Sequence, residues 1–167
     1  MGAGILPMTM IKNSIFFLLG REKSGYWCDF GGSSNTNESL LNTAIREGYE
    51  ELDGFLGDKT TLKYKVLNNL MSIYNIDRYS TYCFYIDHRE VEKLPYYFNN
   101  HRQFIDNEIT YVNSEGIFEK TELKLFSTGD LKREYNKIRP FYREVVDKLI
   151  EQESRYYSYL MNNDITI

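Results

Sequence analysis

The chain has 167 residues, of which 42% are hydrophobic and 26% charged, and its formal net charge is -4. This length suits one globular domain over residues 1–167, and the composition excludes a disordered chain, a fibre or a disulfide scaffold. The net negative charge argues against broad electrostatic binding of nucleic acid, although it leaves room for a local basic groove.

The cysteines and the apolar segments indicate the compartment in which the protein works. Cys28 and Cys83 each lie in a strand-like run, so free buried thiols are expected. The apolar run at residues 15–19 is far too short to span a bilayer and lacks the small-residue cleavage site of a secretory leader. We therefore expect a cytoplasmic protein with no membrane partner.

The first part of the chain predicts three strands. Residues 3–10 and 14–21 are strand-like, and the second of these runs is apolar on both faces, which is typical of a central strand. Residues 26–30 predict a short aromatic strand. It leads into Gly31 and Gly32, where the backbone can bend sharply or approach a ligand closely.

A helix is predicted next, from an N-cap near Asn37 to an end at Asp53 or Gly54. A glycine inside a helix costs about 1 kcal/mol relative to alanine, so we expect either that another element approaches closely at Gly48 or that the helix is less stable. The apolar stripe that must pack on a sheet consists of Leu41, Ala44, Ile45, Gly48 and Leu52.

The middle of the chain is less clearly patterned. Residues 61–76 fit either one long strand or a strand pair, whereas residues 80–86 predict a single strand. Residues 92–113 mix aromatic and polar side chains, and we interpret them as a loop with a short helix.

The last part predicts a strand at residues 122–126, then a turn that caps a helical turn. An amphipathic helix is expected over residues 139–161, with Pro140 at its first position. Strands on both sides of a helix, followed by a terminal helix, predict an α+β fold. We expect an α/β/α sandwich with a mixed β-sheet between helices.

Three glutamates share one face of the helix that is predicted to begin near Asn37. Glu47, Glu50 and Glu51 stand at i, i+3 and i+4, so their carboxylates lie within about one turn of each other and repel. A bound hard cation would convert this repulsion into attraction. For an isolated pattern of this kind, a solvated acidic face with Arg46 as an ion-pair partner is the simpler interpretation.

The surrounding residues resemble the box of the Nudix hydrolase family, which is G, five residues, E, seven residues, then R-E-U-x-E-E-x-G-U with U aliphatic. Two positions depart from it. Gly48 replaces the first aliphatic residue, and Asp53 replaces the box glycine, with Gly54 one residue later. Neither departure touches a carboxylate. The matching residues, over about a seventh of the chain, are Gly32, Glu38, Arg46, Glu47, Glu50 and Glu51.

The resemblance implies a Nudix-like fold and a magnesium-dependent hydrolase. Its reaction would cleave the pyrophosphate linkage of a nucleoside diphosphate joined to another moiety. Arg46 would hold a carboxylate by a bidentate pair, and Glu38 would support the loop–helix junction or a weakly held metal. The implied ligands of Mg²⁺, with Mn²⁺ as a substitute, are Glu47, Glu50, Glu51 and the backbone carbonyl of Gly32.

The general base and the substrate-binding residues each have several candidates. Glu47 and Glu122 are both candidates for the general base, and Glu122 fits a surface role equally well. Arg21, Trp27 and Phe30 lie just upstream of the box and are candidates for binding phosphate and stacking on a base, although Trp27 also fits a core position.

Two alternative functions stay beside the small-nucleotide hydrolase. Removal of the messenger RNA cap would need an RNA path, for which the basic residues of the segment 132–143 are the candidates, although they also fit a solvated helix face. A nucleotide-sensing module without catalysis would typically lack a box carboxylate, and none is lost here. The oligomeric state is open.

Overall fold

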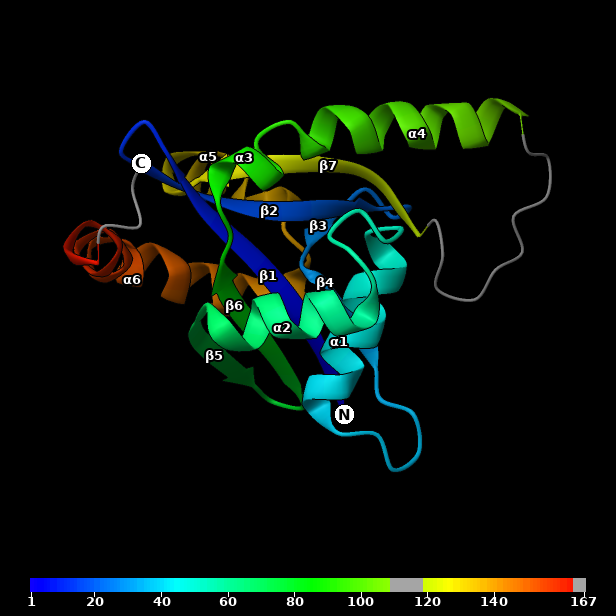
Figure 1. Cartoon of the computed structure of the whole chain (residues 1–167), viewed down its shortest axis with the longest axis horizontal. Coiled ribbons are helices and arrows are strands. Elements are labelled where there is room, and N and C mark those ends of the chain that lie inside the picture. Colours follow the sequence, from blue (N-terminus) through cyan, green and yellow to red (C-terminus); the bar gives the residue numbers. More distant parts are fainter. Residues whose placement is uncertain (109–118, 164–167) are drawn as a thin grey trace.

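A computed structural model of the chain describes residues 1–108 and 119–163 (Figure 1). Its centre is a seven-stranded sheet with the order β3-β2-β1-β6-β5, in which β4 also pairs with β1 and β7 with β2. The strands are β1 (Gly2–Ile11), β2 (Ser14–Glu22), β3 (Trp27–Cys28), β4 (Phe30–Ser33), β5 (Leu70–Ile76), β6 (Tyr79–Tyr85) and β7 (Lys120–Ser127). β1 and β6 run parallel, whereas the other named strand pairs are antiparallel, so the predicted mixed sheet is confirmed.

Helices cover both faces of this sheet, which confirms the predicted α+β sandwich (Figure 1). They are α1 (Leu40–Glu51), α2 (Lys59–Asn68), α3 (His88–Val91), α4 (Leu94–Glu108), α5 (Thr128–Arg133) and α6 (Arg143–Asn162), with 3-10 turns η1 (Tyr135–Lys137) and η2 (Pro140–Tyr142). α1 and α2 pack on one face and α6 packs on the other.

Strand β1 separates two hydrophobic cores. Because successive side chains of a strand point to opposite faces, Ile5 packs toward α1 and α2, whereas Leu6 and Met8 pack toward α6. The same alternation places Leu18 of β2 in the first core and Phe17 in the second. Both strands are therefore central, as expected for apolar runs with two buried faces.

The close approach expected at Gly48 is present. A Cβ atom on Gly48 would lie 2.4 Å from Cδ1 of Ile5, so helix α1 rests directly on β1 at this point. The helix reaches this position because Ala44 and Ile45, one turn earlier, are also buried against the sheet. Gly48 thus sets the depth at which the box helix sits.

The start of the box helix differs from the prediction. Its N-cap is Ser39, whose side chain accepts a hydrogen bond from the backbone N–H of Asn42. Asn37, the predicted N-cap, instead adopts a left-handed conformation with φ of 62° in the preceding loop. The helix ends at Glu51, and Gly54 follows with φ of 72°.

Two helices occupy segments predicted as strand or loop. Residues 61–68 belong to α2, which Asp58 caps, and residues 70–76 form strand β5. The buried residues of α2 are only Leu62 and Val66. The segment 92–113 contains α4, which runs from Leu94 to Glu108, and residues 109–113 lie outside the described part of the chain.

The C-terminal helix begins later than predicted. Pro140 opens the 3-10 turn η2, and the α-helix starts at Arg143. Val145 and Leu149 belong to its buried stripe, but Phe141 is 41% exposed and stands outside that stripe. Cys28 and Cys83 are free and buried, as predicted. None of the described helices combines the length and apolarity needed to cross a membrane.

Replacing Gly48 with alanine should lower the free energy of unfolding. The added methyl gains about 1 kcal/mol of helix propensity, but overpacking against Ile5 typically costs about 1–3 kcal/mol. Urea unfolding of G48A would measure the net loss. In an Ile5→Val background, which removes the nearest atom, the same substitution should cost less; an equal cost in both backgrounds would contradict the close approach.

Candidate active site

Arg46 organises the outer part of the site. Its Nε and Nη2 atoms donate to the two carboxylate oxygens of Glu38, each over 2.9 Å, which is the bidentate geometry that the Nudix resemblance implies for this arginine. Nη1 donates to Glu47 over 2.7 Å and to Glu50 over 3.4 Å. The Nη2 atom also reaches the backbone carbonyl of Ser33. One guanidinium thus joins helix α1 to strand β4.

Glu38 secures the loop that leads into α1. Its carboxylate accepts hydrogen bonds from the backbone N–H of Asn35 and from the Thr43 hydroxyl, in addition to the Arg46 pair. Hydrogen bonding to Arg46 lowers the pKa of Glu38 to about 2. Glu38 is therefore ionised at neutral pH, and it supports the loop–helix junction.

Glu47 packs against the backbone of Gly32. A Cβ atom at Gly32 would lie 2.6 Å from the Glu47 carboxylate, so only glycine leaves room for it there. Burial raises the pKa of Glu47, and the contact with Arg46 opposes that shift. The Gly32 backbone and a Glu47 carboxylate with reduced hydration consequently face each other across a short gap.

Glu51 is the most deeply buried box carboxylate, with 4% of its surface exposed. It accepts a hydrogen bond of 2.8 Å from the backbone N–H of Gly31, and the ammonium of Lys120 lies 3.5 Å away. Burial nevertheless raises the pKa of Glu51 to about 8, because desolvation outweighs the attraction of Lys120. This carboxyl needs more positive charge nearby to ionise at neutral pH.

Lys120, which was not predicted as a site residue, is buried, with only 1% of its surface exposed. Its ammonium also lies 3.8 Å from Glu22, and its aliphatic stem passes over Gly20. Burial by itself lowers the pKa of Lys120, but the surrounding acidic groups, led by Glu51, outweigh burial and raise it. A predicted strand that began at residue 122 gave no signal for this lysine.

A cavity of about 420 Å³, which we call the box cavity, opens beside Glu51. Glu119 lines it, together with Glu22 of β2 and the glycine pair of β4. Glu122 is not among its lining residues, because it lies opposite Arg21 of β2 and forms a half-exposed ion pair of 3.5 Å with it. A register irregularity after Arg21 places Lys120 opposite Glu22. The role of Glu122 as a general base stays a prediction.

The predicted stacking residues are corrected. Trp27 is 5% exposed and packs edge-on against Phe126, with ring centroids 5.1 Å apart. Phe30 is fully buried beneath α1. Neither ring offers a face to a ligand, because both belong to the hydrophobic cores. Arg21 stays at the surface, where its role in substrate binding remains a prediction.

The box carboxylates are held by cationic side chains of the protein itself. Within residues 1–108 and 119–163, no three acidic, histidine or cysteine side chains converge as a ready-made metal cage. Arg46 holds Glu47 and Glu50, and Lys120 holds Glu51. The oxygen donors are nevertheless gathered on one helix face beside the β4 backbone.

Two solved structures have the same fold. The chain matches a C. elegans Ap4A hydrolase, solved as a binary complex, with a TM-score of 0.52 at 12% identity, over 97% of this chain and 99% of that one. It matches a bifunctional NMN adenylyltransferase/ADP ribose pyrophosphatase from Francisella tularensis, complexed with AMP and a manganese ion, with a TM-score of 0.54 at 13% identity, over 90% of this chain and 41% of that one.

No protein-family model and no curated protein sequence matches the chain. At the identities of the two structures, the likeness shows the fold alone. It is the mixed sheet between helices that the Nudix resemblance implies, and the chain therefore has a Nudix-like fold.

The stability of the metal-free protein should depend on Glu51. Its pKa in the folded state, about 8, lies above the ordinary value of 4.5, so the folded protein binds the extra proton between these values. This contribution is complete below about pH 4.5 and is lost as the pH rises through about 8, with a slope of at most about 1.4 kcal/mol per pH unit.

Urea unfolding from pH 5 to pH 8 with a chelator present would measure this slope. Glu51→Gln should flatten it, whereas Glu151→Gln, which changes an exposed carboxylate of α6, should leave it as in the wild type. If Glu51→Gln retained the wild-type slope, the assignment of the buried proton to Glu51 would be wrong.

Proposed function

We propose that this chain, with its Nudix-like fold, is a divalent-metal-dependent hydrolase of nucleoside diphosphates linked to another moiety. The observation that carries the proposal is Glu51, a buried carboxyl that stands at the wall of the box cavity and is only partly neutralised by Lys120. A carboxyl kept in such a place destabilises the empty site, and a bound cation relieves that cost.

The donor set fits a hard divalent cation. Carboxylate and carbonyl oxygens are the ligands that Mg²⁺ and Mn²⁺ prefer. The Glu47 carboxylate already lies against the Gly32 backbone, which lacks the Cβ that would fill this space. We propose that Glu47, Glu50, Glu51 and the Gly32 carbonyl hold the ion. When bound, it would neutralise phosphate charge and acidify a coordinated water.

The protein's own groups would orient the reaction. The Glu47 carboxylate, whose pKa is raised by burial, is the general base that we propose, accepting the proton of the attacking water at an Oε atom. Arg46 would keep this carboxylate in place through its 2.7 Å hydrogen bond. Glu119, which lines the box cavity together with Glu51, is a further acidic candidate for the general base, beside Glu122.

Nucleotides are the substrate class that we propose, and the fold neighbours support that choice. One of them is named for hydrolysis of Ap4A and the other for hydrolysis of ADP ribose. Both names describe compounds in which a nucleoside carries a chain of phosphates. A cytoplasmic setting is also proposed, supported by the free thiols of Cys28 and Cys83.

The basic segment 132–143 gives little support to an RNA path. Arg133 pairs with Asp130, and Lys137 pairs with Glu134 over 3.3 Å. Arg139 pairs with Glu22 over 2.7 Å. Three of the basic side chains of the segment are thus engaged by neighbouring carboxylates, which weakens the case for an RNA track there.

A substrate panel would test the proposal. Dinucleoside polyphosphates, ADP-ribose, nucleotide sugars and capped RNA would be incubated with and without Mg²⁺, and the products separated by chromatography. We expect Mg²⁺-dependent cleavage of the diphosphate link in at least one small nucleotide. Glu50→Gln and Glu51→Gln should then lower kcat by orders of magnitude, because an amide is a poorer metal ligand.

Glu90→Gln is the matched control, since Glu90 forms a surface ion pair with Lys65. It should turn over substrate like the wild type. Full activity in both box variants would exclude the assigned ligands, and a failure of every compound on the panel would exclude the hydrolase itself.

A further inference from the structure

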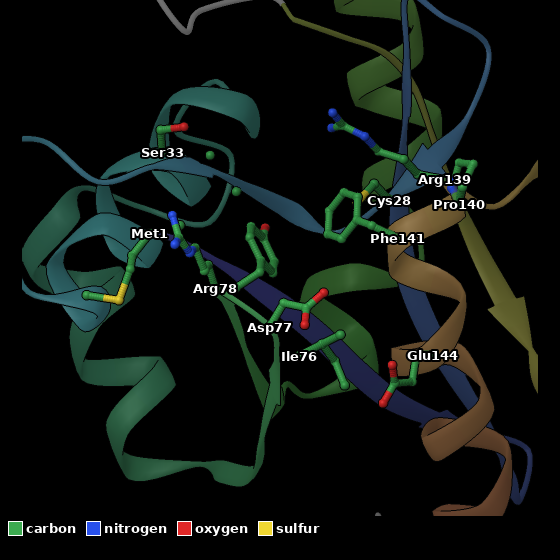
Figure 2. A pocket seen from close by; sticks show the side chains of 14 residues that line it. Met1, Cys28, Ser33, Ile76, Asp77, Arg78, Arg139, Pro140, Phe141 and Glu144 are labelled. Atoms are coloured by element: carbon green, nitrogen blue, oxygen red, sulfur yellow. The ribbon is translucent and has the colours of Figure 1, made fainter.

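A second cavity, of about 570 Å³, adjoins the box cavity. We call it the aromatic cavity, and its distinctive lining residues are Asp77, Arg78, Tyr79, Arg139, Phe141 and Glu144 (Figure 2). Both cavities are also lined by Gly31 and Gly32 of β4. A ligand that occupies both cavities would therefore cross β4 at Gly31 and Gly32.

Phe141 presents a partly open ring inside the aromatic cavity. It is 41% exposed, and Figure 2 shows it among the side chains that line the cavity. Its edge-to-face contact with Tyr79, at 5.2 Å between centroids, fixes its position. An exposed aromatic ring held rigidly by its neighbours is the usual surface on which a planar base stacks.

A buried hydrogen bond holds the Tyr79 side chain in place. Its hydroxyl donates to the buried carboxylate of Asp29 over 2.8 Å, and a Cβ atom at Gly31 would lie only 2.0 Å from that hydroxyl oxygen. Gly31 is thus the residue that admits the Tyr79 side chain, while Gly32 admits the Glu47 carboxylate. The two adjacent glycines, which line both cavities, make room for these two side chains.

Arg139 stands between the cavities and lines both. Its guanidinium carbon lies 5.0 Å from the Phe141 ring centroid, and its Nη1 donates to Glu22 over 2.7 Å. Its backbone N–H donates to the carbonyl of Trp27, which anchors the segment ahead of α6 to strand β3. A phosphate passing from one cavity to the other would lie beside this cation.

The remaining polar groups of the aromatic cavity suit the edge of a base. Asp77, in the turn between β5 and β6, and Glu144, in the first turn of α6, are carboxylates that accept hydrogen bonds. Nucleobases offer N–H donors along their edges for these carboxylates, and Arg78, which also lines the cavity, can donate to base acceptors. The volume also lies in the range of ligand pockets, about 300–1,000 Å³.

We propose that the aromatic cavity binds the nucleobase of the substrate, with the base stacked on Phe141 and the diphosphate running past Arg139 and Gly31–Gly32 into the box cavity. The proposal rests on the proposed hydrolase function, and it assigns the nucleoside end of the substrate to this side of β4. Phe141 is then a substrate-binding residue that favours ligands with a base over ligands without one.

Binding without turnover tests this assignment separately from hydrolysis. AMP, GMP, CMP and ribose 5-phosphate contain no pyrophosphate link, and their dissociation constants would be measured by calorimetry on the full chain with Mg²⁺. We expect at least one of the nucleotides to bind more tightly than ribose 5-phosphate. Phe141→Ala should weaken that nucleotide about tenfold or more, and leave ribose 5-phosphate unchanged.

Two further variants control the experiment. Phe141→Tyr keeps an aromatic face and should retain wild-type affinity, whereas Tyr159→Ala removes an aromatic ring of α6 that is 52% exposed and should have no effect. Circular dichroism would confirm that each variant is folded, and Phe141→Leu replaces Phe141→Ala should the alanine variant unfold.

Equal binding of nucleotides and ribose 5-phosphate by the wild type would overturn the proposal, and so would an unchanged nucleotide affinity in the Phe141 variant. The base site stands if nucleotide affinity falls as expected, even where the substrate panel shows no hydrolysis. That combination would reject the proposed reaction alone.

Discussion

The rest of the site depends on the burial of the Glu51 carboxyl. Helix α1 must sit close to the sheet for this group to reach the Gly31 N–H, and the absence of a side chain at Gly48 permits that depth. Lys120 then comes from β7 to meet the same carboxyl. One buried acid thus fixes the spacing of a helix and two strands, at a cost in desolvation that the protein only partly offsets.

The two glycines of β4 explain how one strand can serve both the chemistry and the recognition of a substrate. Gly32 gives its space to Glu47, and Gly31 gives its space to Tyr79. Glu51 and Glu119 line the box cavity, whereas Tyr79 and Phe141 line the aromatic cavity. Arg139 is the side chain shared by the two cavities, and it links the segment before α6 to the box.

The box helix and its two faces were predictable because a motif and a 3.6-residue period agree over the same residues. Sequence reasoning also found the close approach at Gly48. It failed at α2, where Leu62 and Val66 are the only buried residues and threonines favour a strand interpretation. Lys120 escaped because a register irregularity in the β2–β7 pair decides which side chains point inward, and no local pattern reveals that shift.

We propose that Glu51 is a ligand of a bound cation, and counting the protons released when the metal binds would test this. At pH 7 a carboxyl with a pKa of about 8 is mostly protonated, so binding of Mn²⁺ must displace close to one proton per chain. Calorimetric titration in buffers of different ionisation enthalpy would count it. We predict release in the wild type and little release in Glu51→Gln; Mn²⁺ binding to the wild type without proton release would contradict the account.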